Sequence, residues 1–387
     1  MKICHLSFSP IADDARVRRH GDALVEAGHT VVAIGLPGAK GAAPEWETRA
    51  IDPTGPSHLP RWLRVLGMAA CRWLPALAEP IYWSMAHNRA MAACACDIKA
   101  DLFVANDWST LPIACRLAET HRARFVYDSH EYAVEEGADR WTWRLLVSPF
   151  VRAIETRFIK DAAAVFTVGD RIAAMMQSDH GLRTAPLVVR NTVPLVESPF
   201  RPCGDIVEVL YQGLIRADRG LETLIRSVPL WRQEFRLRLR GPGEPAIVDH
   251  LKALAATLAA DRIVFDPPVP PSDMVAAANR SDVGIHPIPP ISNQSRYCLP
   301  NKFFEYAMAG LALCVSDSDE MTALLRRHAL GHVIDADTPH AIAEAINSFD
   351  RPGIDAAKRR AIEASRHLCW ENERAHLISA FAALGDG

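Results

Sequence analysis

The 387-residue sequence lacks any uninterrupted apolar run of about 18 residues, the length that a helix needs to cross a bilayer. It also lacks the apolar stretch of a secretory signal peptide, because charged residues follow the start closely, from Asp13 to Arg19. Neither sign of charge dominates, since 43 Lys and Arg face 46 Asp and Glu, and this balance argues against a nucleic-acid partner. We therefore expect a cytoplasmic protein, with the inner face of the membrane as a further location.

Several motifs that mark common protein classes are also missing. The nine cysteines form no C-x-x-C pair, and the closest two, Cys94 and Cys96, need distant help to hold zinc, so we expect reduced thiols. The loop at 7–14 has no G-x-G-x-x-G, and the chain has neither G-x-x-x-x-G-K-[ST] nor G-x-S-x-G. These absences disfavour nicotinamide and flavin enzymes, P-loop proteins and nucleophile-elbow hydrolases. Asp and His residues show no ligand spacing, so we expect no metal and no resident cofactor.

The sequence does contain a regular alternation of short apolar runs and longer amphipathic stretches, which is typical of a parallel sheet wrapped by helices. In the first half, strands are expected at 2–8, 30–34, 102–105, 124–127, 164–168 and 187–189, with a helix at 16–27. The alternation then begins afresh, with strands expected at 207–211, 236–240, 263–265, 283–287, 311–315 and 331–334 and helices at 222–227 and 246–259. The pattern predicts an α/β protein with two Rossmann-like domains, joined by the proline-rich segment 190–204.

One segment in the second half carries the strongest chemical signal. Residues 298–310 read Cys-Leu-Pro-Asn-Lys-Phe-Phe-Glu-Tyr-Ala-Met-Ala-Gly, and Pro300 and Asn301 suit the start of a helix. Lys302 then lies in the first turn, and Glu305 lies one turn later on nearly the same face. A lysine beside exposed helix N–H groups suits a diphosphate, and a carboxylate can accept two hydrogen bonds from a ribose diol. The alternative is a surface ion pair on an amphipathic helix.

The string at 300–310 resembles the donor-binding motif of retaining glycosyltransferases with the GT-B fold, of the family 4 type. Further marks follow in order along nearly the whole chain: Arg16, Gly28-His29, Val126 to Glu131, Phe166 to Val168, Tyr211 to Gly213, Arg219 to Glu222 and Gly241 to Gly243. The resemblance implies two Rossmann-like domains that face a central cleft, an acceptor-binding domain at 1–195 and a nucleotide-sugar-binding domain at 204–367. It also implies that a helix at 368–387 crosses back to the first domain, the alternative being a plain terminal helix of the second.

The activity implied by this resemblance is transfer of a sugar from a nucleoside-diphosphate sugar to a glycan, lipid-linked or small-molecule acceptor, with retention of configuration. The leaving phosphate takes the proton of the acceptor, so neither a protein nucleophile nor a metal ion is required. Such an enzyme belongs to polysaccharide biosynthesis. Two rival functions stay open: a nucleotide-sugar epimerase of the same fold, and a non-catalytic partner subunit that binds nucleotide sugars.

The resemblance also assigns roles to particular residues. The predicted catalytic residues are His130, Arg219 and Lys302, and the predicted acceptor-binding residues are Asp14, Arg16 and Asp107. The predicted donor-binding residues are Glu305, as the ribose acceptor, with Gly213, Arg216, Gly241, Asn301 and Tyr297. Several of these assignments have a structural alternative. Asp107 can be a helix N-cap, which is the role we favour, and His130 can be a hydrogen-bonding residue of its loop. Arg216 and Arg219 can be solvated charges of their loop.

Two positions depart from the pattern of the family. Tyr297 stands eight residues before Glu305, where the family commonly has a second acid that holds the donor sugar. The polar side chains near this position are Asn, Gln and Ser at 293–295. Leu214 stands where the family often has an arginine, so we expect Arg216 to substitute. These departures motivate the rival function of a non-catalytic subunit.

The segment 61–74 mixes Trp and Leu with arginines. At helical spacing, Trp62 and Leu66 fall on a different face from Arg61 and Arg64, which predicts an interfacial helix on an anionic membrane near a lipid-linked acceptor. Residues 141–146 form a second aromatic and basic stretch. The alternative, which we favour, is a pair of ordinary helices that bury their apolar faces.

Overall fold

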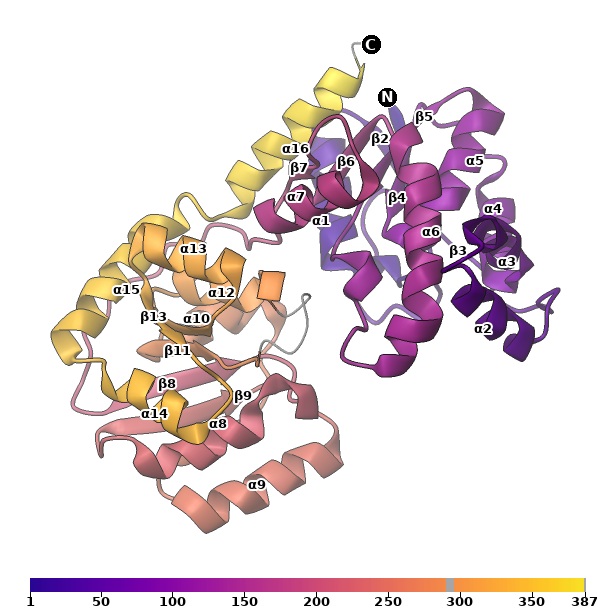
Figure 1. Cartoon of the computed structure of the whole chain (residues 1–387). Coiled ribbons are helices and arrows are strands. Elements are labelled where there is room, and N and C mark those ends of the chain that lie inside the picture. Colours follow the sequence, from indigo (N-terminus) through magenta and orange to yellow (C-terminus); the bar gives the residue numbers. More distant parts are fainter. Residues whose placement is uncertain (290–295, 386–387) are drawn as a thin grey trace. The chain divides into compact units, whose positions relative to one another are not determined.

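The chain forms two compact units in the computed structural model, which describes residues 1–289 and 296–385 (Figure 1). The first unit comprises Met1–Arg190 together with Arg374–Gly387, and the second comprises Asn191–Glu373. Each unit contains one parallel sheet with its own helices, so the prediction of two Rossmann-like domains is confirmed. No helix in the described ranges is long and apolar enough to span a membrane.

The first unit is built on a seven-stranded parallel sheet in the order β3-β2-β1-β4-β5-β6-β7. Its strands are β1 (Lys2–Leu6), β2 (Thr30–Gly35), β3 (Glu47–Ala50), β4 (Leu102–Asn106), β5 (Arg124–Asp128), β6 (Ala164–Thr167) and β7 (Leu187–Val188). Its helices are α1 (Ala15–Glu26), α2 (Arg61–Ala70), α3 (Ala78–Ser84), α4 (Ala86–Ala95), α5 (Leu111–His121), α6 (Ser148–Phe158) and α7 (Asp170–His180), with the π-helical turn η5 (Trp143–Val147) leading into α6.

The central strands of this sheet are apolar runs because helices cover both faces of a parallel sheet. β1 lies between β2 and β4, with Cys4 opposite Val32 on one side and Phe103 on the other, and all three side chains are buried. The sequence prediction missed β3, since Glu47–Ala50 is polar, short and mostly exposed at the edge of the sheet. Such a strand shows no apolar pattern because it has no buried face.

The second unit is built on a six-stranded parallel sheet in the order β10-β9-β8-β11-β12-β13. Its strands are β8 (Val207–Gln212), β9 (Phe235–Arg240), β10 (Ile263–Asp266), β11 (Val283–His286), β12 (Ala312–Ser316) and β13 (Gly331–Ile334). Its helices are α8 (Leu221–Ser227), α9 (Pro245–Ala259), α10 (Met274–Ala278), α12 (Asn301–Met308), α13 (Asp319–His328), α14 (Pro339–Asn347) and α15 (Arg351–Ser365).

The core of the second unit lies on both faces of its sheet. Val283 and Ile285 of β11 join the apolar cluster that includes side chains of α8, α9 and α14. On the other face, the cluster around Leu313 of β12 includes Phe303 and Phe304 of α12. α12 is therefore fixed against the sheet by its apolar side, which leaves its first turn at the end of the strands.

The last helix, α16 (Trp370–Gly385), belongs mostly to the first unit. Phe381 stacks on Phe166 of β6 with ring centroids 5.6 Å apart, and Arg374 pairs with Glu26 of α1 at 2.6 Å. The chain thus returns to its first unit after completing the second.

In both sheets the strand order reverses beside a central strand, between β1 and β4 in the first unit and between β8 and β11 in the second. At such a point the connecting helices leave to opposite faces of the sheet, and ligands of open α/β proteins bind there, outside the carboxyl ends of the strands. A functional site is therefore expected among the residues that follow these four strands.

Candidate functional site

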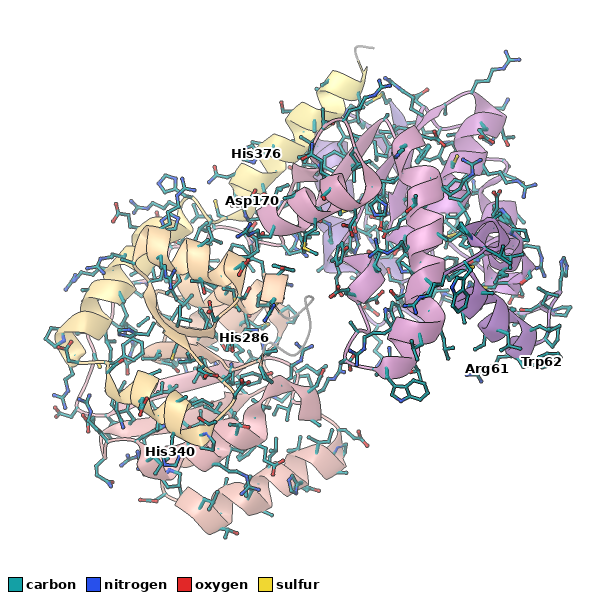
Figure 2. The ribbon with its side chains drawn as sticks, in the orientation of Figure 1. Arg61, Trp62, Asp170, His286, His340 and His376 are labelled. Atoms are coloured by element: carbon teal, nitrogen blue, oxygen red, sulfur yellow. The ribbon has the colours of Figure 1, made fainter. Side chains whose placement is uncertain are left out.

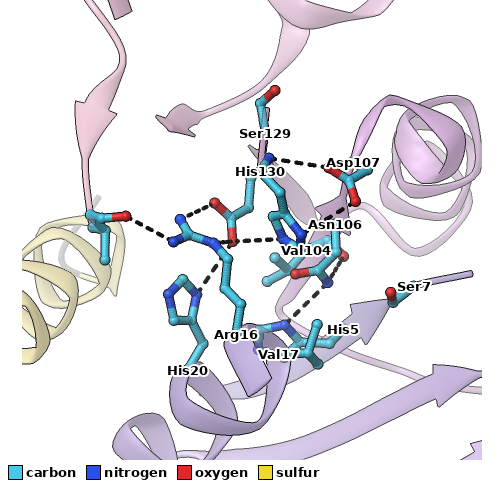
Figure 3. A network of polar contacts seen from close by, with 12 residues as sticks. His5, Ser7, Arg16, Val17, His20, Val104, Asn106, Asp107, Ser129 and His130 are labelled. Atoms are coloured by element: carbon cyan, nitrogen blue, oxygen red, sulfur yellow. Dashed lines mark hydrogen bonds and ion pairs between the residues drawn. The ribbon is translucent and has the colours of Figure 1, made fainter. Parts of the chain in front are cut away.

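A polar cluster in the first unit is organised around Asp128, the last residue of β5 (Figure 3). Its carboxylate is buried, and Arg16 of α1 grips it with two hydrogen bonds, Nε to Oδ2 at 2.9 Å and Nη2 to Oδ1 at 2.6 Å. The remaining Nη1 donates to the carbonyl of Val189 at 2.8 Å. Because the guanidinium of Arg16 is buried and engaged within its own unit, we expect it to position the site rather than to contact the acceptor.

His130 lies between two carboxylates. Its Nδ1 is 3.3 Å from Oδ2 of Asp107, and its Nε2 is 3.5 Å from Oδ2 of Asp128. Burial alone lowers the pKa of an imidazole, but the two carboxylates outweigh it and raise the pKa of His130 to about 9. At neutral pH this ring is therefore an imidazolium, held at the carboxyl edge of the sheet.

The two other histidines of the cluster stay neutral. Burial lowers the pKa of His5 to about 4. Burial and the charge of Arg16 hold the pKa of His20 well below its ordinary value, although its Nδ1 is 3.4 Å from Oδ2 of Asp128. Burial also acts to raise the pKa of Asp128, but Arg16 outweighs it and keeps the carboxylate ionised. The environment thus selects one of three histidines to carry charge.

Asp107 follows β4 in an unusual backbone conformation, with φ 66° and ψ 161°, a region that glycine adopts readily and other residues seldom do. Its N–H donates to the carbonyl of Asp128 at 2.9 Å, and its Oδ1 accepts from the N–H of His130 at 3.1 Å. Asp107 occupies the predicted N-cap position of the helical turn Trp108–Thr110, but in the described structure its carboxylate makes no capping hydrogen bond there and contacts His130 instead. The strained residue ties β4 to the loop after β5.

Asp14, a predicted acceptor residue, is the N-cap of α1. Its Oδ1 accepts from the N–H groups of Arg16 at 3.2 Å and Val17 at 3.1 Å, and its Oδ2 accepts from Ser9 Oγ at 2.5 Å. These bonds satisfy donors at the start of the helix that carries Arg16. We therefore expect Asp14 to orient that helix.

In the second unit, two glycines end neighbouring strands. Gly213 follows β8 with φ +137°, and Gly241 follows β9 with φ +149°. A Cβ at Gly241 would lie 1.9 Å from the carbonyl oxygen of Gly213, and a Cβ at Gly213 would lie 2.9 Å from Nζ of Lys302. Only glycine suits these positions, because a side chain would collide with its neighbours. The two backbone turns can therefore pack against each other next to Lys302.

Lys302 lies in the first turn of α12, as the sequence predicts, with Nζ 4.2 Å from the centre of the Tyr211 ring. Burial and the charge of Arg219 lower its pKa to about 7, against the opposing effect of Glu305. Arg219 belongs to the turn before α8, where a Cβ at Gly220 would lie 2.0 Å from the carbonyl oxygen of Pro287. The structure thus brings Arg219, Lys302 and Glu305 to the end of β8 and β11.

His286, the last residue of β11, was missed by the sequence analysis. It shares the α12 face of the sheet with Gly284, where a Cβ would meet the ring of Tyr306. The ring is fully buried, and neither nitrogen has a hydrogen-bond partner among the described residues (labelled in Figure 2). Burial, with the charges of Lys302 and Arg219, holds its pKa well below the ordinary value. The sequence signal that could have identified His286 is its position at the end of an apolar run, just before Pro287.

The other predicted donor residues lie in less constrained places. Arg216 is about half exposed and pairs with Asp218 at 3.1 Å. Asn301 is exposed at the first position of α12, and Tyr297 is half-buried. The polar residues 293–295 lie outside the described residues. Among residues 1–289 and 296–385, no three His, Cys, Asp or Glu side chains are placed to share a metal ion.

The segment 61–74 does not pack as an ordinary amphipathic helix. Every residue of α2 is at least partly exposed, and Trp62, at the edge of the first unit in Figure 2, exposes 63% of its surface. The preferred interpretation, that the apolar faces of the two segments are buried, is therefore wrong for Trp62 and Leu66, whereas Cys71 of the first segment is buried. We call the exposed apolar side chains on these two segments the tryptophan surface: Trp62, Leu63, Leu66, Trp73, Leu74, Trp141 and Leu145. The helices of the two segments, α2 and η5, contact each other.

Two family models match the chain, the glycosyl transferase 4-like domain over residues 14–192 and glycosyl transferases group 1 over residues 207–349. No curated protein sequence matches it. Sucrose-phosphate synthase from Thermosynechococcus elongatus has a similar structure, with a TM-score of 0.75 at 15% identity over 100% of this chain and 99% of that one.

Two further solved structures are similar. HepE from Anabaena, in complex with UDP, has a TM-score of 0.70 at 15% identity and covers 99% of this chain and 100% of that one. A glycosyltransferase from Rickettsia africae has a TM-score of 0.70 at 11% identity and covers 98% of this chain and 97% of that one. At these identities the likeness establishes the GT-B fold.

The charge on His130 can be measured by NMR. The ring should stay protonated until the pH approaches 9, and Asp107→Asn should lower that pKa by about 1 or more, because one of two carboxylates is lost. Since the folded pKa lies above the ordinary 6.5, the linked stabilisation is complete below pH 6.5 and disappears as the pH rises through 9. His130→Gln identifies the signal, and the exposed His250 serves as control. Titration of His130 near pH 6.5 would contradict the assignment.

Proposed function

The chain belongs to the group 1 glycosyltransferases, with a glycosyl transferase 4-like domain in its first unit, and on this premise we propose that it is a retaining enzyme. It moves a sugar from a nucleoside-diphosphate sugar to a glycan, lipid-linked or small-molecule acceptor. The second unit holds the donor and the first unit binds the acceptor. The reaction proceeds without a metal ion.

The observation that carries this proposal is the pair of cations at the switch point of the second unit. Burial and the charge of Arg219 lower the pKa of Lys302, and both cations stand beside the glycine turns at the end of β8. Two cations over a backbone without side chains suit a diphosphate, which needs close approach and charge-assisted hydrogen bonds. The ion pair of Arg219 with Asp218 is long, at 3.9 Å. Glu305 lies one turn further along α12, and we expect it to accept hydrogen bonds from the ribose diol.

The chemical step requires little of the protein beyond charge and position. The bond from the anomeric carbon to the diphosphate oxygen breaks, and a bond from that carbon to the acceptor oxygen forms on the same face. The acceptor proton passes to the leaving diphosphate. Lys302 and Arg219 stabilise the negative charge that grows on the leaving group, and preorganised charges are the most effective means of doing so.

In the first unit, we expect His130 to lie beside the sugar. Its two ring N–H groups face Asp107 and Asp128, which fix its orientation, so it acts through its positive charge at neutral pH. Arg16 and Asp14 support this arrangement from α1. Solved relatives support the choice of donor, since HepE binds UDP and UDP-glucose in its structures.

The decisive experiment is turnover. The protein is incubated with a panel of nucleotide sugars and a bacterial glycan and lipid extract, with and without a chelator, and release of nucleoside diphosphate is measured. Acceptor-dependent release that survives the chelator, with the product anomer matching the donor by NMR, supports the proposal. Free sugar or an epimer formed without acceptor supports the epimerase, and binding without turnover supports the non-catalytic subunit.

Glu305→Ala should weaken nucleotide binding by roughly ten- to a hundredfold, because the ribose loses a charged acceptor worth about 1.5–3 kcal/mol. Isothermal calorimetry with UDP and the other nucleoside diphosphates measures this. Glu344→Ala, an exposed glutamate on α14, is the matched control and should bind normally. An unchanged affinity in Glu305→Ala rejects the ribose role.

Donor affinity should fall as the pH rises above 7, approaching tenfold for each pH unit, because Lys302 loses its proton. Below pH 7 the ammonium is present and affinity is constant. A nucleotide sugar is the right probe because its phosphates do not titrate in this range. Lys302→Arg keeps its charge and should bind equally well from pH 6 to 9. Parallel pH profiles for the two proteins would contradict the role of Lys302.

We also propose that the tryptophan surface rests on an anionic membrane, which brings the enzyme to a lipid-linked acceptor. Trp73 exposes 75% of its surface and Leu74 exposes 59%, and Arg61 and Arg72 are exposed on the same segment. Indole rings and arginine stems are suited to the boundary between headgroups and acyl chains.

The double variant Trp62→Ser, Trp73→Ser should sediment with acidic-lipid vesicles at least about tenfold more weakly than the wild type, since each buried apolar side chain contributes about 1.5–3 kcal/mol. Wild-type binding should also weaken with salt, over a Debye length of about 10 Å at 0.1 M. Ile206→Ser, an exposed apolar residue of the second unit, is the control. Wild-type protein that stays in the supernatant at low salt refutes the membrane contact.

A further inference from the structure

A cavity of about 890 Å³ lies in the first unit, between the segment that follows α2 and the helices η5 and α6. Arg72, Pro75 and Glu79 line it on one side, and Arg144, Arg152 and Arg157 line it on the other. None of these residues belongs to the cluster around Asp128 or carries a role in the proposed transfer. A volume of this size is typical of a site for a small molecule.

The lining of this cavity is strongly basic. Of the described residues that form it, four are arginines and one, Glu79, is acidic. Arg152 is hydrogen-bonded to Asp179 at 3.1 Å, and Arg157 lies 3.6 Å from Asp161. Arg72 and Arg144 are exposed and have no ion-pair partner among residues 1–289 and 296–385. Two guanidinium groups are therefore available to an anion in the cavity.

The same arginines are flanked by exposed apolar side chains. Trp73 and Leu74 follow Arg72 directly, and Leu145, 49% exposed, follows Arg144. A site for a free anion in water needs no apolar surroundings. An anion joined to a hydrocarbon chain needs both a basic cavity and an apolar surface beside it, and this part of the first unit offers the two together.

We propose that the cavity binds the phosphate headgroup of an anionic membrane lipid while the tryptophan surface enters the interface. A phosphate monoester fits best, because it carries up to two charges and several acceptor oxygens for the forked donors of Arg72 and Arg144. This inference rests on the proposed membrane contact and deepens it, because it makes the contact selective for a headgroup and not merely for negative charge.

The test compares two kinds of vesicle with equal surface charge, phosphatidylcholine with phosphatidic acid, a monoester, and phosphatidylcholine with phosphatidylglycerol, a diester. Wild-type protein should bind the phosphatidic acid vesicles about tenfold more tightly in sedimentation. Arg144→Gln should bind both kinds equally, at the weaker level. Equal binding of both vesicles by the wild type overturns the proposal.

Arg61→Gln is the matched control, because Arg61 is exposed on α2 and does not line the cavity. It should weaken binding to both vesicles alike and keep the preference for phosphatidic acid. If Arg61→Gln and Arg144→Gln behave the same, diffuse charge explains the binding and the cavity has no special role. Melting temperatures equal to that of the wild type show that both variants are folded.

A third arm separates the lipid from a soluble phosphate. Glycerol 3-phosphate carries the same phosphate monoester but lacks the acyl chains. The protein should therefore bind it far more weakly than it binds phosphatidic acid vesicles. Affinity for glycerol 3-phosphate equal to that for phosphatidic acid vesicles overturns the lipid assignment. Nucleotide binding by Arg144→Gln should be normal, and Glu305→Ala should keep the vesicle preference, so failure of the proposed transfer and failure of the lipid site are distinguishable.

Discussion

The buried ion pair of Arg16 and Asp128 is the interaction on which the polar part of the first unit depends. It joins α1 to the end of β5 and, through the carbonyl of Val189, to the chain after β7. Loss of one partner from such a pair costs about 3–5 kcal/mol, because the other charge is left buried alone. Burial acts to raise the pKa of Asp128, and Arg16 is the strongest influence that lowers it, so the ion pair maintains one of the two carboxylates that raise the pKa of His130.

The two units arrange their charged side chains differently at the carboxyl ends of their strands. At the switch point of the first unit, charges are neutralised inside the protein, with Asp107, Asp128, Arg16 and His130 in mutual contact. At that of the second, burial and the charge of Arg219 lower the pKa of Lys302. A preorganised ionic cluster is suited to orienting hydroxyl groups, whereas an excess of positive charge is suited to receiving a dianionic group.

Backbone conformations that side chains disfavour are found at the same strand ends. Gly213 and Gly241 allow two turns to touch below Lys302, and Asp107 adopts a similar conformation without being glycine. The strain at Asp107 is of order 1–3 kcal/mol and persists because hydrogen bonds to Asp128 and His130 hold it from both sides.

The sequence by itself determined the features that depend on neighbours along the chain. Periodicity located most strands within one or two residues, and Pro300 marked the start of α12, because burial patterns and helix starts are local properties. Only the tertiary structure decided that Arg16 pairs with Asp128, 112 residues away, that Asp107 contacts His130, that His286 is buried without partners, and that Trp62 is exposed. Those outcomes depend on which strands lie side by side and which helix faces are covered, and these are relations between distant segments that no local pattern contains.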